Sequence, residues 1–275
     1  MRNFNPELET ESIVDFIKDQ KTIQNTKGAT IGLSGGIDSC VCAALLVRAL
    51  GPEHVLGIAM PEKQSSPNDL KDAQLIAKWL GIELKIQPLT PLLEMFGLYE
   101  YMKNWDWDDI KQRYYLNEVK ELIPMEIEYA MIMKLRGRAY ILTNESKKIN
   151  YLQCQTINKS EWLLGMFDKF GDTIGDIAPM WHLYKTEVFA LGKYLDVSER
   201  IMEREPSCGL FPIKMTETEE MGMSHEDMDE LLYYFDTLKL QNKEFVENKF
   251  SKKTIDKVRN WIKVSEVKRQ IPIQL

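Results

Sequence analysis

The chain has 275 residues, long enough to bury a full core as one large α/β domain. Its formal net charge of −7 argues against general nucleic-acid binding, which needs a basic face. The sequence has no run of about 20 apolar residues and no apolar signal-peptide core near its start, so we expect neither a membrane span nor secretion. The four cysteines show no zinc-like or redox spacing, which favours reduced structural thiols in a cytoplasmic protein.

The first third of the chain alternates apolar runs with amphipathic segments. Residues 7–20 carry apolar side chains at helical spacing among acids, which predicts a helix. Short apolar runs at 27–33 and 54–60 and an alternating segment at 82–87 predict strands, and helices are predicted between them at 38–50 and 66–80. Strand, helix and strand in succession form a right-handed parallel unit, so the pattern predicts an α/β fold.

The remainder is predicted to be mainly helical. Residues 98–124 combine tyrosines and tryptophans with charged residues, and we interpret this aromatic segment either as a helical excursion covering the core or as a partner surface or lid. A fourth strand is predicted at 150–155, and helices are predicted at 125–142, 160–170, 185–195, 216–222, 224–238 and 242–264. We expect the tail at 267–273 to be extended. No long linker is visible, so one domain over 1–275 is predicted.

The stretch Ser34-Gly-Gly-Ile-Asp-Ser39 separates the first predicted strand from its helix. Two glycines in such a turn let backbone N–H groups approach a ligand, and a helix N-terminus favours an anion. The Gly-Lys-Ser/Thr of a P-loop and the third glycine of a dinucleotide fingerprint are both missing. The stretch resembles the pyrophosphate loop of N-type ATP pyrophosphatases, which cleave ATP between the α and β phosphates. A glycine turn without a ligand is the simpler alternative.

Further motifs follow in a consistent order: Ser65-Ser66, Asp72-Ala73, Asn158-Lys-Ser-Glu161, Phe167-Asp-Lys-Phe-Gly-Asp172, Leu183-Tyr-Lys-Thr-Glu187, Pro206-Ser-Cys-Gly-Leu210 and Lys268-Arg269. Together with the glycine loop they resemble the ammonia-dependent NAD synthetases from about residue 28 to the C-terminus. The aromatic segment fits worst. The resemblance implies a doubly wound, Rossmann-like parallel sheet with helices on both faces and a helical C-terminal region.

The resemblance also implies roles for individual residues. It assigns ATP binding to Ser34, Gly35, Gly36, Ile37, Asp38, Ser39, Met60, Thr156, Lys185 and Ser207. It assigns Mg²⁺ to Asp38 and Glu161, whose carboxylates suit a hard cation. It assigns deamido-NAD to Arg136, Arg138, Lys169, Asp176, Lys268 and Arg269. Asp38 and Lys185 are the candidate catalytic residues, and Asp176 is a candidate base for ammonium.

The implied reaction activates a carboxylate. ATP converts the acid to an acyl-adenylate, pyrophosphate leaves, and ammonia displaces AMP. Fixed cations and Mg²⁺ stabilise the charge that gathers at the α-phosphate. The implied partners are ATP, deamido-NAD and ammonia, with no nucleic acid and no membrane. A homodimer is also implied, with the helix at 125–142 as a candidate contact.

Simpler interpretations and departures from the family pattern leave alternatives open. Glu161 can favour a helix N-terminus, the two arginines can pair with surface acids, and Asp176 can be a turn residue. Gln155 replaces the usual glycine, Ile132 the usual asparagine and Val267 the usual histidine. A paralogous amide ligase acting on another carboxylate is therefore an alternative, and a non-catalytic nucleotide-binding protein is a third.

Overall fold

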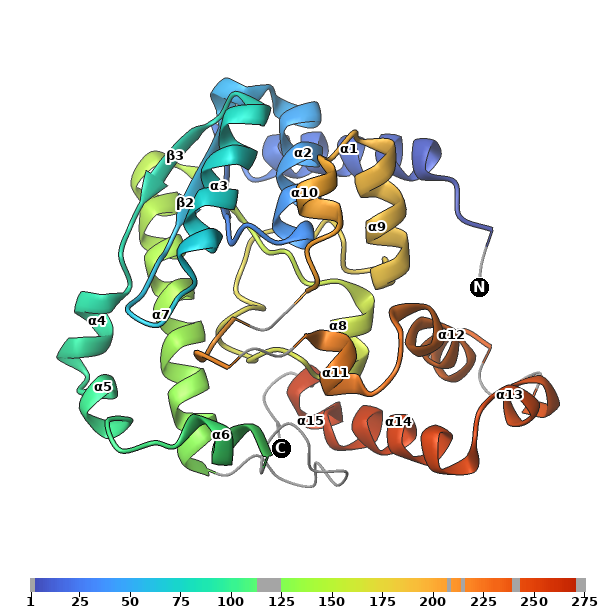
Figure 1. Ribbon diagram of the computed structural model, residues 1–275. Coiled ribbons are helices and arrows are strands. Elements are labelled where there is room, and N and C mark those ends of the chain that lie inside the picture. The colour runs from blue at the N-terminus through green and yellow to red at the C-terminus, as the bar shows by residue number, and fades with distance from the viewer. Residues whose placement is uncertain (1–2, 113–124, 207–208, 214–215, 239–242, 271–275) are drawn as a thin grey trace, which may run out of the picture.

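The computed structural model describes residues 3–112, 125–206, 209–213, 216–238 and 243–270 (Figure 1). Its centre is a parallel four-stranded sheet in the order β3-β2-β1-β4, composed of β1 (Gly28–Gly32), β2 (Val55–Ala59), β3 (Glu83–Ile86) and β4 (Tyr151–Cys154). Ala29 of β1 pairs with Val55 of β2 on one side and with Leu152 of β4 on the other. The strand order therefore reverses at β1, and such a switch point leaves a crevice at the carboxyl ends of the strands.

Helices cover both faces of the sheet, as predicted. One face carries α1 (Pro6–Ile23), α2 (Ile37–Leu50), α3 (Pro67–Leu80) and α9 (Lys185–Tyr194), and the other carries α7 (Met125–Ile149) (Figure 1). Ile31 of β1 packs in the main core with α2, whereas Leu56 and Ile58 of β2 pack with Leu142 of α7. β1 and β2 are buried on both sides, which explains why their sequences read as apolar runs, whereas β3 at the edge of the sheet is partly exposed and alternates.

The described part of the aromatic segment lies beside α7. It contains α5 (Leu98–Tyr101) and α6 (Trp107–Ile110), and it follows α4 (Thr90–Met95) (Figure 1). Leu98 and Ile110 are buried in a second apolar cluster, against which Trp105 and Trp107 pack. These side chains cover a core, which is the first of the two interpretations. Tyr114 and Tyr115 lie outside the described residues.

The C-terminal part of the chain is helical. Besides α9, its elements are α8 (Lys159–Leu164), α10 (Glu199–Met202), α11 (Glu217–Met221), α12 (His225–Asp236), α13 (Lys243–Lys249), α14 (Lys252–Val264) and α15 (Glu266–Arg269). In the N-terminal half, a short 3-10 turn, η1 (Pro52–His54), precedes β2. A third apolar cluster packs α8 against α12 and α14.

Several boundaries differ from the prediction. The helix predicted at 160–170 ends at Gly165, whose left-handed backbone (φ 74°) caps it. The single helix predicted at 242–264 is two helices, because Ser251 caps the start of α14. The tail expected to be extended forms α15 as far as Arg269, and the helix predicted to end at 142 continues to Ile149.

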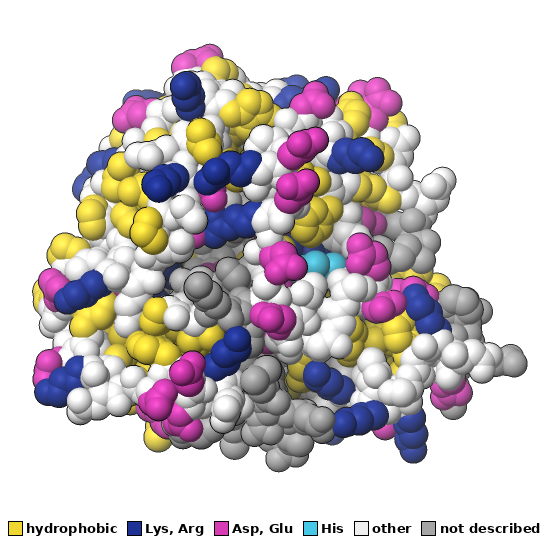
Figure 2. Space-filling view, viewed as in Figure 1, with side chains coloured by type: hydrophobic (Ala, Val, Ile, Leu, Met, Phe, Trp, Pro, Cys, Tyr) yellow, Lys and Arg dark blue, Asp and Glu magenta, His cyan; other side chains and the backbone are white. Residues whose placement is uncertain are grey.

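Charges of both signs are interspersed over the face seen in Figure 2. Among the described residues, no helix combines the length and the apolar character needed to cross a membrane.

Candidate active site

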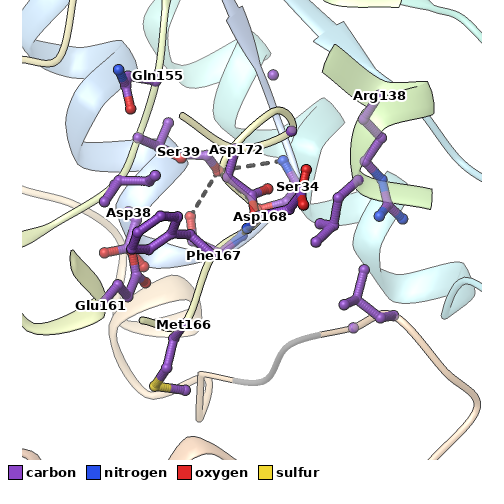
Figure 3. Close-up of a pocket in the computed structure, with 18 of the residues that line it drawn as sticks. Ser34, Asp38, Ser39, Arg138, Gln155, Glu161, Met166, Phe167, Asp168 and Asp172 are labelled. Atoms are coloured by element: carbon purple, nitrogen blue, oxygen red, sulfur yellow. Dashed lines mark hydrogen bonds between the residues drawn. The ribbon is translucent and has the colours of Figure 1, made fainter. Parts of the chain in front are cut away.

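A cavity of about 730 Å³ lies at the carboxyl ends of the strands (Figure 3). It is lined by residues that directly follow three strands: Leu33 and Ser34 after β1, Met60 and Pro61 after β2, and Gln155 after β4. Side chains from α7 and from residues 164–168 complete it. The cavity therefore occupies the crevice that the strand order creates at β1.

The glycine loop connects β1 to α2 at one side of this cavity. Gly35 has φ +83°, and a Cβ there would lie 2.7 Å from the Asp69 carbonyl oxygen, so the turn requires glycine. The Gly36 N–H donates to Ser34 Oγ over 3.2 Å, and the Ser34 N–H donates to Ser39 Oγ over 3.3 Å. The loop is thus fixed by its own hydroxyls, with the N-terminus of a 14-residue helix directed at the cavity.

A buried lysine stands among carboxylates beside this loop. Lys185, the first residue of α9, has a side chain only 2% exposed, and its Nζ lies 2.6 Å from Asp38 Oδ2. The same Nζ lies 3.4 Å from Glu217 Oε2 and 3.6 Å from Glu161 Oε1. Asn158 Nδ2 donates to Asp38 Oδ1 over 3.0 Å and so orients that carboxylate. Residues far apart in the sequence meet at one charge cluster.

The protonation of this cluster follows from its burial and charges. Burial alone would lower the pKa of Lys185, but Asp38, Glu217 and Glu161 raise it above its ordinary value, so the lysine stays charged. Burial, followed by repulsion from Asp38, raises the pKa of Glu161 well above its usual range. Lys185 is therefore a permanent cation, and the Asp38 carboxylate, 2.6 Å from its ammonium, is its nearest counter-charge.

The cluster suits a hard cation only in part. Among the described residues, no group of three or more metal-ligating side chains converges on one point. Asp38 and Glu161 nevertheless offer carboxylate oxygens around the same ammonium at the loop. Two carboxylates completed by phosphate oxygens and water are a normal Mg²⁺ environment, so these residues fit that ion.

The opposite side of the cavity carries a second cation. Arg138 extends from α7 on the side of the view opposite Asp38 and Glu161 (Figure 3), and it lines the cavity together with Asp168 and Asp172. Burial lowers the pKa of Arg138, while Glu62, Asp172 and Asp69 oppose that shift. Lys268 also lines the cavity and donates to the carbonyls of Gly165 (3.0 Å) and Phe167 (3.1 Å). Arg138 and Lys268 thus give this side of the cavity positive charge suited to phosphate or carboxylate groups.

The sequence model of the NAD synthase family matches residues 9–272 of the chain. The chain belongs to the NAD synthase family. It is 33% identical over 282 residues to the NH₃-dependent NAD⁺ synthetase of Thermotoga maritima (96% of this chain, 98% of the relative). It is 36% identical over 260 residues to that of Methanocaldococcus jannaschii (94% and 93%).

Solved structures of the same family resemble the whole chain. The NMN synthetase of Francisella tularensis is 28% identical, with a TM-score of 0.79 and 99% coverage of both chains. The NH₃-dependent NAD synthetase of Campylobacter jejuni is also 28% identical, with a TM-score of 0.74 and the same coverage. The doubly wound α/β fold expected from the sequence is thus the fold of these relatives.

The structure separates the predicted site residues of this family member into two groups. The cavity is lined by Ser34, Gly36, Ile37, Asp38, Ser39, Met60, Arg138, Thr156, Glu161 and Lys268. Gly35 shapes the loop from behind, and Lys185 contacts Asp38 and Glu161. Ser207 lies outside the described residues.

The remaining predicted residues lie away from the cavity lining. Arg136 makes a two-point contact with Asp168 (2.9 and 3.1 Å). Arg269 donates to main-chain carbonyls at the end of α8, and Lys169 Nζ lies 5.7 Å from the centre of the Phe170 ring. Asp176 accepts from the Gln153 N–H (2.8 Å) and pairs with Lys147. Their positions give no support to substrate contacts or to Asp176 as a base.

Two departures from the family pattern occur at the cavity. Gln155 and Ile132 both line it, whereas Val267 is 68% exposed and does not. Gln155 Nε2 donates to the Thr173 carbonyl, and its Oε1 is buried with no hydrogen-bond partner among the described residues. Gln155 therefore adds a side chain to the cavity, as the sequence predicts.

Sequence reasoning missed Glu217. This residue starts α11 and lies at the cavity, yet its local signal is only that of a helix start, because Thr216 and Glu219 form a capping box there. Glu161 shows the same ambiguity: its Oε2 accepts from the Asn158 N–H as a cap, while its Oε1 faces Lys185. A capping carboxylate can thus also belong to the site.

Proposed function

We propose that this protein amidates deamido-NAD to NAD with ammonia and ATP, releasing AMP and pyrophosphate. The observation that carries this proposal is the cluster of Lys185, Asp38 and Glu161 beside the glycine loop, in a chain of the NAD synthase family. Anion-binding backbone at one end of the cavity and Arg138 at the other suit a nucleotide and an acid held together.

The first half-reaction is attack of the substrate carboxylate on the α-phosphorus of ATP. A carboxylate oxygen forms the new P–O bond while the bond to pyrophosphate breaks. The loop N–H groups and the Lys185 ammonium stabilise the charge on the departing pyrophosphate. Mg²⁺, which Asp38 and Glu161 would hold, supplies further compensation of phosphate charge when bound.

The second half-reaction is attack of ammonia on the activated carbonyl. The nitrogen forms the amide bond, AMP leaves with the bonding electron pair, and the nitrogen gives up a proton. The chain contributes chiefly by holding the two substrates together, because a fixed near-attack geometry removes much of the entropic barrier. Arg138 and Lys268 are the cavity-lining cations placed to bind the acid.

A second substrate is favoured by a specific observation. The Francisella tularensis structure, with a TM-score of 0.79, is described as an NMN synthetase. Gln155 and Ile132 alter the cavity surface in this chain. Nicotinate mononucleotide, the acid that corresponds to NMN, is therefore the alternative acid.

The proposal is tested by incubating the protein with ATP, Mg²⁺ and ammonium and either acid, and measuring amide and AMP. NAD formation with a higher kcat/KM for deamido-NAD supports the main proposal, and a preference for the mononucleotide supports the alternative. Asp38→Asn keeps the acceptor for Asn158 but removes a charge, so it should lose AMP formation while staying folded. No AMP with either acid would refute both.

We also propose a cytoplasmic homodimer. Exposed apolar side chains gather along α7 and α5, where Met125 is 80% exposed, Tyr140 67% and Tyr101 47%. Exposed apolar side chains of this size favour a protein contact. Sedimentation of the wild type and of a Tyr140→Glu variant tests it, because a monomeric wild type contradicts the proposal.

A further inference from the structure

A buried ion pair joins three segments around the cavity. Lys134 of α7 and Glu62, in the segment after β2, have side chains that are 0% exposed, and Lys134 Nζ donates to Glu62 Oε1 over 2.8 Å. The same ammonium donates to Gln64 Oε1 over 2.7 Å and to the Leu210 carbonyl oxygen. One cation thus connects α7, the β2–α3 segment and residues 209–211.

All three segments line the cavity next to their contacts with Lys134. The lining residues are Pro61 and Ser65 from the β2–α3 segment, Met131 and Leu135 from α7, and Gly209 and Leu210 from the third segment. Lys134 itself is buried behind them. The ion pair therefore lies directly behind the residues that line the cavity, and it fixes the positions of the three segments relative to one another.

The aromatic segment supports this pair from behind. The Tyr99 hydroxyl donates to Glu62 Oε2 over 2.7 Å. Lys134 Nζ lies 5.1 Å from the centre of the Phe211 ring, which Trp105 and Trp107 contact with centroid separations of 6.1 and 5.7 Å. The part of the chain that fits the family pattern worst is thus packed against residues 210–211.

The ionic state of the pair is consistent with this arrangement. Burial would raise the pKa of Glu62, but the hydrogen bond and charge of Lys134 hold it below its ordinary value. Burial and Glu62 raise the pKa of Tyr99 to about 12, so its hydroxyl remains a donor. The hydrogen bonds that Lys134 and Glu62 make are therefore charge-assisted and directional.

Stability alone does not account for a fully buried ion pair. Replacing such a pair with apolar groups is often neutral or stabilising, whereas removing one partner is strongly destabilising because it leaves an unpaired buried charge. What an ion pair adds is direction, because an ammonium with three acceptors fixes the segments that carry them. Here the acceptors include the main-chain carbonyl of Leu210, which lines the cavity.

Arg204 also lines the cavity and forms a hydrogen bond with the phosphate loop. Its Nη1 donates to Asp72 Oδ2 over 2.9 Å and to the Gly35 carbonyl over 3.4 Å, and its Nη2 donates to Asp69 Oδ1. We propose that Lys134 and Glu62 are positioning residues that hold residues 209–211 in the wall of the cavity that the phosphate loop also lines, for ATP binding. This inference rests on the proposed function only for the identity of the ligand, ATP.

The test compares Lys134→Met with the double variant Glu62→Gln/Lys134→Met. The single variant leaves a buried carboxylate unpaired and should lower the unfolding temperature, and the double variant should regain most of that loss. The dissociation constant of ATP with Mg²⁺, measured by calorimetry, should stay raised by about 10- to 100-fold in both, as expected for a misplaced binding segment. KM for ATP should rise more than kcat falls.

A matched control is available on the same helix. Glu145 of α7 is buried and pairs with Lys85 and Lys148, but none of the three lines the cavity. Lys85→Met/Glu145→Gln should therefore leave ATP affinity unchanged.

A double variant with wild-type stability and wild-type ATP affinity would overturn the inference, because the pair would then be structural only. If the double variant does not fold, Tyr99→Phe removes the hydrogen bond to Glu62 and the one from the Lys63 N–H, and it should still raise the ATP dissociation constant about threefold. An unchanged constant in that variant also overturns it. Calorimetry requires no turnover, so wild-type protein that binds ATP but forms no amide refutes the proposed function alone.

Discussion

Lys185→Met tests the charge cluster most directly. The lysine is 2% exposed and lies within 3.6 Å of Asp38, Glu161 and Glu217, so its removal leaves these partly buried carboxyl groups without their cation. At an effective dielectric constant of about 20, unit charges 3.5 Å apart attract by about 5 kcal/mol. Desolvation of the lysine and protonation of a carboxylate offset part of this, so we expect a net loss of about 3–5 kcal/mol in the free energy of unfolding.

The assay is urea denaturation with and without Mg²⁺, beside Lys193→Met as a control. Lys193 is an exposed residue in the last turn of the same helix, α9, and its loss should change stability by less than about 0.5 kcal/mol. Mg²⁺ should restore part of the stability of Lys185→Met, because a cation that binds the folded carboxylates shifts the equilibrium toward the folded state. AMP formation should still be lost.

If Lys185→Met and Lys193→Met have the same free energy of unfolding in the presence of a metal chelator, the reasoning is refuted. The carboxylates would then not depend on this ammonium in the folded protein. A loss of stability that Mg²⁺ does not change would contradict the metal assignment of Asp38 and Glu161 alone.

Three further predictions follow from single residues. Gly35→Ala should lower the free energy of unfolding, measured by denaturation, by about 2–4 kcal/mol and raise KM for ATP, because the new Cβ meets the Asp69 carbonyl. Gly97→Ala is the control: this residue also has a positive φ (+70°), but no atom lies within 4 Å of the new Cβ, so the loss should be only about 1–2 kcal/mol. Arg138→Gln should raise KM for the acid about tenfold, and Arg136→Gln should leave it within twofold, in steady-state assays. Burial holds the pKa of His225 at about 4, so the folded protein keeps this histidine neutral while the unfolded chain protonates below about 6.5. Stability should therefore fall by up to about 3 kcal/mol as pH decreases from about 6.5 to 4, and His225→Asn should lack this component in denaturation curves across that range.

The sheet and the glycine loop could be predicted because their signals are local. The runs around β1, β2 and β4 are apolar in sequence, and the turn between β1 and α2 declares itself through Gly35 and Gly36. Helix ends were less predictable where a cap competes with an apolar pattern. Gly165 ends α8 early, although apolar residues continue beyond it.

The site was predictable as far as its motifs carry it. The family resemblance assigns Asp38, Glu161 and Lys185 to the site. In the structure, the Asp38 and Glu161 carboxyl groups lie within 3.6 Å of the Lys185 ammonium. Which arginine reaches the cavity was not predictable, because Arg136 and Arg138 differ by two positions on a helix. Two positions rotate a side chain by about 200° on a helix of 3.6 residues per turn, so only the packing of α7 decides between them.

The sequence by itself determined the succession of strands and helices along the chain, the phosphate-type loop and the kind of chemistry that its charged residues support. The tertiary structure alone decided that Glu217 joins the lysine cluster, that Asp176 is engaged by Lys147, and that Lys134 meets Glu62 behind the cavity. The physical reason is range. Local backbone preferences and apolar periodicity act over a few residues, whereas these charge contacts form only once distant segments have packed around the switch point of the sheet.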